Sequence, residues 1–153
     1  MKTLNSRASI GVGAAIAIVS LANQPTNALD LMVSCRMPHA SIDTLLGVNS
    51  NKAVVIAHFK RSDIIHACSS GWTQNSSYKD CLKEFRSLIG SGVSATADCK
   101  DPKVTIKYDD GTIAVSGGSP FIKTCSTGGM SLAHSYQILC PKNADLHIKN
   151  CCD

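Results

Sequence analysis

The sequence predicts an α+β fold, a small disulfide-rich domain in which an antiparallel sheet of short strands packs against one main amphipathic helix at about residues 77–89. Three observations lead to this prediction. The chain of 153 residues contains 8 cysteines, one stretch repeats its apolar residues with a helical period, and several short stretches alternate as strands do. The length suits one domain. A hydrophobic fraction of 44% and only 11 glycines exclude a disordered or collagen-like chain.

The N-terminus has the features of a secretory signal peptide. Two basic residues are followed by an uncharged apolar run, Ala8–Ala22, which is shorter than the ~20 residues of a membrane span. A proline and several small residues come next and predict cleavage after Ala28, with cleavage after Ala22 as the alternative. We therefore expect a signal peptide in residues 1–28 and one disulfide-stabilised domain in residues 29–153.

The charge of the predicted exported domain is close to neutral. Removing residues 1–28 from the 153 leaves 125 residues. The net charge falls from +4 to +2, because Lys2 and Arg7 are removed and the removed segment contains no acidic residue. This charge, without a run of lysines and arginines, does not indicate nucleic-acid binding. No later stretch is apolar enough to span a bilayer, so we expect no stable membrane insertion. The prediction is a secreted monomer, extracellular or, if the source is Gram-negative, periplasmic.

The cysteines all belong to the predicted exported domain, at Cys35, Cys68, Cys81, Cys99, Cys125, Cys140, Cys151 and Cys152. An even number in a short exported domain predicts a disulfide framework, here of four bonds. The connectivity stays open, although Cys151 and Cys152 should reach different partners because a bond between neighbours strains the peptide. Zinc binding is the rival interpretation, but the chain has no C-x₂-C pair. We predict no metal and no cofactor.

The clearest single element is a helix at Ser77–Ile89. Its apolar residues recur at steps of three and four, at Tyr78, Cys81, Leu82, Phe85, Leu88 and Ile89. Ser77 is a suitable N-cap, and Gly90 is a suitable C-terminal stop. Because Cys81 lies on the apolar stripe, we expect its disulfide to clamp this helix onto the sheet.

Short apolar or alternating stretches predict the strands. Val104–Val115 indicates a β-hairpin, because alternating residues flank a turn at Asp109–Gly111. β-Branched runs predict buried strands at Ala53–Phe59 and Ile64–Ile65. Three more short strands are expected at Phe121–Cys125, Tyr136–Cys140 and Leu146–Cys151.

A catalytic site is one functional hypothesis. Histidine titrates near neutrality and can transfer protons, so His58 and His134 could act with Glu84, the only glutamate, in a small secreted hydrolase of the ribonuclease type. The sequence positions of these three residues give the hydrolase hypothesis little support. Glu84 falls among lysines on the polar side of the predicted helix, and His58 lies within an apolar run. Motifs for a nucleophile elbow, a phosphate-binding loop or a zinc protease are absent, so an enzyme is the alternative.

Several exposed positions favour binding instead. Trp72 lies in a polar loop and could anchor a partner, and Arg61 could bind a phosphate or carboxylate. Asn75 begins a sequence for N-glycosylation, which matters only in a eukaryotic host. The pair Lys60-Arg61 could be cut by a secretory endoprotease, but a solvated strand end is the favoured interpretation. Binding residues are expected in loops on the rigid scaffold, at Gly71–Ser76 and Gly117–Pro120.

We therefore expect a secreted cysteine-rich protein that binds an extracellular or host protein target, effector- or toxin-like in an interaction with a host or competitor. This expectation is based on the predicted signal peptide, the high number of cysteines and the lack of a catalytic signature. The alternatives are the small hydrolase of ribonuclease type described above and an inhibitor of a secreted hydrolase.

Overall fold

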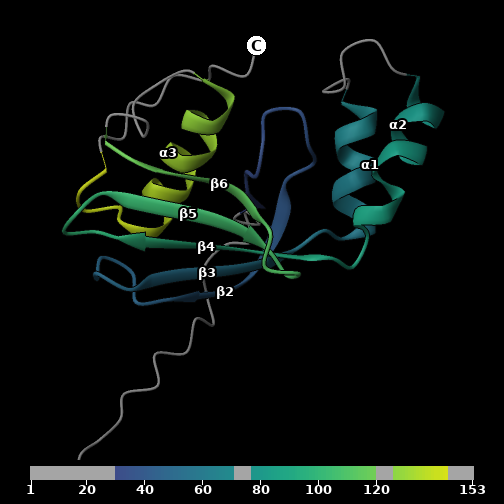
Figure 1. The fold of residues 1–153 in the computed structure, drawn as a ribbon. Helices are drawn as coiled ribbons and strands as arrows, with labels where there is room; N and C mark the ends of the chain where they lie inside the picture. The colour runs from purple at the N-terminus through teal and green to yellow at the C-terminus, as the bar shows by residue number, and fades with distance from the viewer. Residues whose placement is uncertain (1–29, 71–76, 120–125, 145–153) are drawn as a thin grey trace, which may run out of the picture.

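The computed structural model describes residues 30–70, 77–119 and 126–144, and they form an antiparallel sheet with three α-helices (Figure 1). The six strands lie in the sheet in the order in which they occur along the chain. Every neighbouring pair is antiparallel. The strands are β1 (Asp30–Leu31), β2 (Ala40–Leu46), β3 (Ala53–His58), β4 (Gly92–Asp98), β5 (Lys103–Tyr108) and β6 (Ile113–Gly118). This confirms the predicted α+β class with an antiparallel sheet.

One face of the sheet forms the core. Alternate residues of β3 and β4 are buried, among them Val55, Ala57, Val93 and Ala95, as expected when successive side chains point to opposite faces. Helix α3 (Thr127–Leu139) packs on this face, close to β6 (Figure 1). The main core therefore lies between α3 and the sheet.

The position of α3 overturns the prediction of a strand at Tyr136–Cys140. Side chains are buried on nearly every side of this helix, including those of Met130, Leu132, Ala133, Ser135, Tyr136 and Leu139. A helix buried all round has no polar stripe to reveal its period. Ser126 caps it by accepting a hydrogen bond from the Gly129 amide. A disulfide from Cys140, next to its end, reaches Cys99 beyond β4.

The predicted helix at 77–89 is confirmed in position, as α2 (Tyr78–Phe85) followed by a 3₁₀ turn at Arg86–Leu88. The Ser77 side chain accepts a hydrogen bond from the Asp80 amide, as an N-cap does. Gly90 has φ +85°, the left-handed conformation that ends the helical segment.

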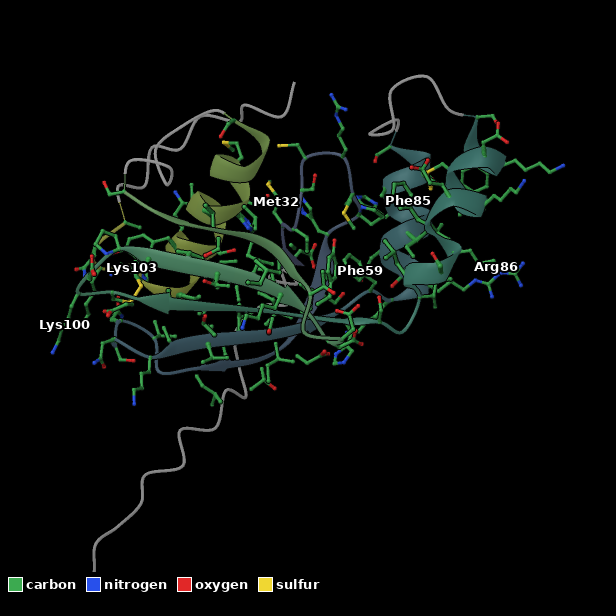
Figure 2. The ribbon with its side chains drawn as sticks, viewed as in Figure 1. Met32, Phe59, Phe85, Arg86, Lys100 and Lys103 are labelled. Carbon is green, nitrogen blue, oxygen red and sulfur yellow. A yellow bond between two sulfur atoms is a disulfide. The ribbon has the colours of Figure 1, made fainter. Side chains whose placement is uncertain are left out.

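The environment of α2 differs from the prediction. Cys81 bonds to Cys68 of α1 (Arg61–Ser69), and the two helices share a small core with Ile64 and Phe85. The helices stand as a pair beside one end of the sheet (Figure 1), and Figure 2 shows Phe85 between them and Arg86 pointing outward. The clamp of Cys81 onto the sheet is therefore wrong, because Cys81 joins two helices.

Two further predictions have clear outcomes. Ile64–Ile65 belongs to α1 rather than to a strand, because the Asp63 carboxylate accepts a hydrogen bond from the Lys60 amide and so caps a helix that starts just before it. The hairpin at Val104–Val115 is confirmed by β5, β6 and their pairing. Its turn contains Gly111 at φ +85°. The signal peptide and the strands predicted at 121–125 and 146–151 lie outside the described residues.

Candidate functional site: the open face of the sheet

The face of the sheet opposite α3 carries exposed and half-buried side chains, and we call it the open face. The same alternation that buries Val55 and Ala57 turns Val54, Ile56 and His58 of β3 outward. Cross-strand register extends the open face over the neighbouring strands. One row runs Thr44, Ile56, Ser94, Lys107 and Ile113, and the next runs Leu46, Val54, Thr96, Thr105 and Ser116.

Hydroxyl groups occupy the middle of the open face. Ser94, Thr96, Thr105 and Ser116 come from three adjacent strands. The Thr105 and Ser116 hydroxyls are 3.0 Å apart and form a hydrogen bond. The open face can therefore donate hydrogen bonds to a ligand and accept them from it, since each hydroxyl does both.

A groove of about 400 Å³ hollows one end of the open face. This is the end farther from α1 and α2, where Lys103 projects in Figure 2. The groove is lined from β3, β4, β5 and the turn before β3, by Asn51, Lys52, Ala53, Val54, Thr96, Ala97, Asp98, Lys103 and Thr105. Lys103 forms an ion pair with Asp101 at its rim, which raises the pKa of Lys103.

Large aliphatic side chains are exposed on the same face. The exposed fractions are 56% for Leu46, 39% for Ile56 and 56% for Ile113. They belong to β2, β3 and β6, so the apolar side chains lie on both sides of the hydroxyl groups described above. Their exposure has no benefit for folding, because an apolar side chain is stabilised by leaving water.

A cluster of charged side chains lies at the other end of the open face, where β3 leads into α1. His58 donates a hydrogen bond from Nδ1 to Asp43, and Lys60 forms an ion pair with the other carboxylate oxygen at 3.5 Å. The hydrogen bond from His58 holds the pKa of Asp43 below its ordinary value of 3.8. Asp43 is the extra residue of a bulge in β2, where the register shifts between Ile42 and Thr44.

The proposed catalytic residues are not brought together. His58 lies on the open face beside Asp43, whereas His134 is half-buried in α3 on the core side. Glu84 is exposed on α2. Across the described ranges, no hydrogen bond or ion pair joins any two of the three. The geometry therefore gives no support to the ribonuclease-type cluster.

The predicted binding residues lie in different places. Arg61 is exposed at the first turn of α1, away from the groove. Trp72 and Asn75 lie outside the described residues, as does Pro120 at the end of the second predicted loop. The dibasic pair Lys60-Arg61 starts α1, where the Lys60 amide donates to Asp63, so its backbone is held in a helix start.

The described cysteines agree with a disulfide framework. Cys68–Cys81 and Cys99–Cys140 are bonded, with Cα–Cα distances of 5.7 and 5.5 Å, and Cys35 is disulfide-bonded as well. Cys125, Cys151 and Cys152 lie outside the described residues. Within the ranges given above, no group of three or more histidine, cysteine or acidic side chains could hold a metal ion.

The open face was not among the sites predicted from the sequence. Strand β4, Gly92–Asp98, carries a signal that could have found it, since Val93, Ala95 and Ala97 alternate with hydroxyl and acidic residues. Asp43 has no such signal, because the bulge interrupts the alternation of β2 between Ile42 and Thr44.

No protein-family model matches the chain, and comparisons with curated proteins and with solved structures found no match. None of the described helices is both long and apolar enough to cross a membrane.

Proposed function

We propose that this protein is secreted and acts outside the producing cell by binding a protein target, effector- or toxin-like in an interaction with a host or competitor. The open face of the sheet is the binding surface. The observation that carries the proposal is the combination, on one face, of the groove with the exposed Leu46, Ile56 and Ile113.

The chemistry of the open face suits a protein partner. Protein interfaces combine apolar contact area with hydrogen bonds from polar groups around it. Here the aliphatic side chains supply the apolar area, and the hydroxyl groups of Ser94, Thr96 and Thr105 supply the hydrogen bonds. An exposed apolar group that does not stabilise the fold gains free energy when a partner covers it.

A nucleic acid suits the same surface less well. Single-stranded nucleic acids bind through stacked aromatic side chains and a cationic groove. The open-face positions of the described strands carry no aromatic residue, since Tyr108 is opposite the buried Val93. Asp43 and Asp98 also place carboxylates beside the lysines, which would repel phosphate.

The described disulfides support a rigid binding surface. Cys99–Cys140 joins the end of β4 to the end of α3 and so ties the open sheet to the helix behind it. Binding surfaces on regular, packed elements lose little conformational entropy on association. Buried disulfides also suit a protein that works in an oxidising compartment.

The test uses two isoleucines with nearly equal exposure. Ile56 on the open face is 39% exposed, and Ile65 on α1 is 38% exposed. Fluorescently labelled wild-type protein, Ile56→Asp and Ile65→Asp are titrated onto cells of an organism that the producer contacts, before and after protease treatment of the cell surface. We expect saturable, protease-sensitive binding that Ile56→Asp weakens by at least about tenfold, because it places a charge in the interface.

Ile65→Asp should bind as the wild type does. Equal binding by all three proteins would refute the open face as the interface, provided that circular dichroism shows each variant folded. Binding that survives protease treatment would refute a protein target. If the bound protein proves to be a secreted hydrolase whose activity falls, the protein is an inhibitor of that enzyme.

A further inference from the structure

Two half-buried histidines lie close together on the side of the sheet away from the open face. His39 precedes β2 and His134 lies in α3, and their ring centroids are 6.0 Å apart. The Nδ1 atom of His134 accepts a hydrogen bond from the Met32 backbone amide at 3.3 Å. Figure 2 shows Met32 beside α3. His134 therefore links α3 to the segment that follows β1.

The acceptor role requires a neutral ring at His134. Neutral imidazole has one nitrogen without a proton, whereas both nitrogens of the protonated ring are donors. Protonation would place an N–H of His134 against the N–H of Met32 and remove this hydrogen bond. It would also place a charge in a half-buried position. The second ring raises the cost further, because two imidazolium ions 6.0 Å apart repel each other.

The charged groups that act on this pair come from α1, and they are Asp63 and His66, which both affect the pKa of His39. Asp30 of β1 and Lys60 interact with these two groups in turn. Asp63 attracts a proton toward His39. Its carboxylate already accepts hydrogen bonds from the Ser41 hydroxyl and from the Lys60 amide, so it is held in place away from His134. Burial and the neighbouring His134 outweigh this attraction and lower the pKa of His39 to about 4. Burial likewise lowers the pKa of His134.

We propose that His134 and His39 form an acid-sensitive switch, in which protonation breaks the hydrogen bond to Met32 and loosens α3 from the β1 edge of the sheet. The segment at this edge, Leu31–Val33, is buried in the closed state. Its release exposes apolar surface. The switch does not involve the open face, so it is independent of the proposed function.

The direction of the pH effect follows from the two lowered pKa values. Both histidines bind protons less readily in the closed protein than in an opened or unfolded one. Between pH about 6.5 and pH about 4, the opened state therefore takes up more protons. The closed state is fully favoured above this window, and it loses stability as the pH falls through it.

Hydrogen exchange of the wild-type protein tests the switch directly. The protection factor of the Met32 amide, corrected for the intrinsic pH dependence of exchange, should fall by about tenfold or more between pH 7 and pH 5. Amides of the central strands β3, β4 and β5 should lose much less protection. A Met32 protection factor that stays constant, or that falls only in parallel with β3–β5, would overturn the proposal.

A variant removes the titration without removing the acceptor. In His134→Asn, the amide oxygen takes the place of Nδ1 and cannot be protonated in this range. Met32 protection should therefore lose the part of its pH dependence that comes from His134 and keep the part that comes from the buried His39. The control, His58→Asn, removes an exposed histidine of β3 on the opposite face of the sheet and should respond to acid as the wild type does. A His134→Asn variant that responds to acid as strongly as the wild type would overturn the proposal. The wild-type exchange experiment decides alone if this variant does not fold.

Discussion

At the scale of single residues, one bulge residue organises the charged end of the open face. Asp43 is the extra residue in β2, and its carboxylate receives both His58 and Lys60. Bulges commonly re-aim a side chain at functional surfaces. Ile42 pairs with Ala57 of the core face and Thr44 pairs with Ile56 of the open face, although a regular strand would place these two residues on the same face. No sequence pattern reveals that one residue is inserted between them.

The titration of Asp43 tests this arrangement. We predict that NMR titration of the wild type gives a carboxyl pKa for Asp43 below 3.8, because His58 stabilises the ionised form. In His58→Ala the pKa should move up toward 3.8. In His66→Ala, which changes a histidine elsewhere, it should stay where it is in the wild type. An unchanged Asp43 pKa in His58→Ala would show that the hydrogen bond does not form in solution.

At the scale of elements, local signals predicted what depends on local physics. Ser77, the apolar stripe through Cys81 and Phe85, and Gly90 all act within one helix, so they identified α2 correctly. The turn at Asp109–Gly111 did the same for the hairpin. Helix α3 was missed because Gly128-Gly129 has the composition of a turn and the helix is buried on nearly all sides. A short apolar stretch of that kind does not distinguish a buried helix from a strand.

The two described disulfides should contribute differently, because they join different elements. Cys68–Cys81 closes 13 residues within the α1–α2 pair, and Cys99–Cys140 closes 41 residues across the main core. Chain entropy alone assigns them ~3 and ~4 kcal/mol of stability. Replacing Cys99 and Cys140 by alanine should therefore lower the global free energy of unfolding by about 4 kcal/mol in urea titrations.

Replacing Cys68 and Cys81 by alanine should act locally. Hydrogen exchange should accelerate in α1 and α2, which have a separate small core, while the amides of β3–β5 keep most of their protection. Equal loss of protection in the helices and in the central strands would contradict the separation of the two cores.

At the scale of the whole molecule, the proposed binding surface depends on the register of the strands. The class of the fold followed from composition and from two clear local elements. The open face instead requires five adjacent strands to be aligned, so that Ile56, Ser94 and Lys107 fall into one row. Long-range pairing of this kind is set by the packing of the opposite face against α3, and hydrophobic patterning within each segment does not specify it.

If the open face is the binding surface, a bound partner covers it. Hydroxyl-radical labelling of the free and target-bound protein, read by mass spectrometry, measures this directly. We predict that oxidation of Leu46, Ile56 and Ile113 falls severalfold on binding, whereas oxidation of Ile65 and Tyr78 on the helical pair is unchanged. Protection of Ile65 and Tyr78 without protection of the three open-face residues would contradict the claim.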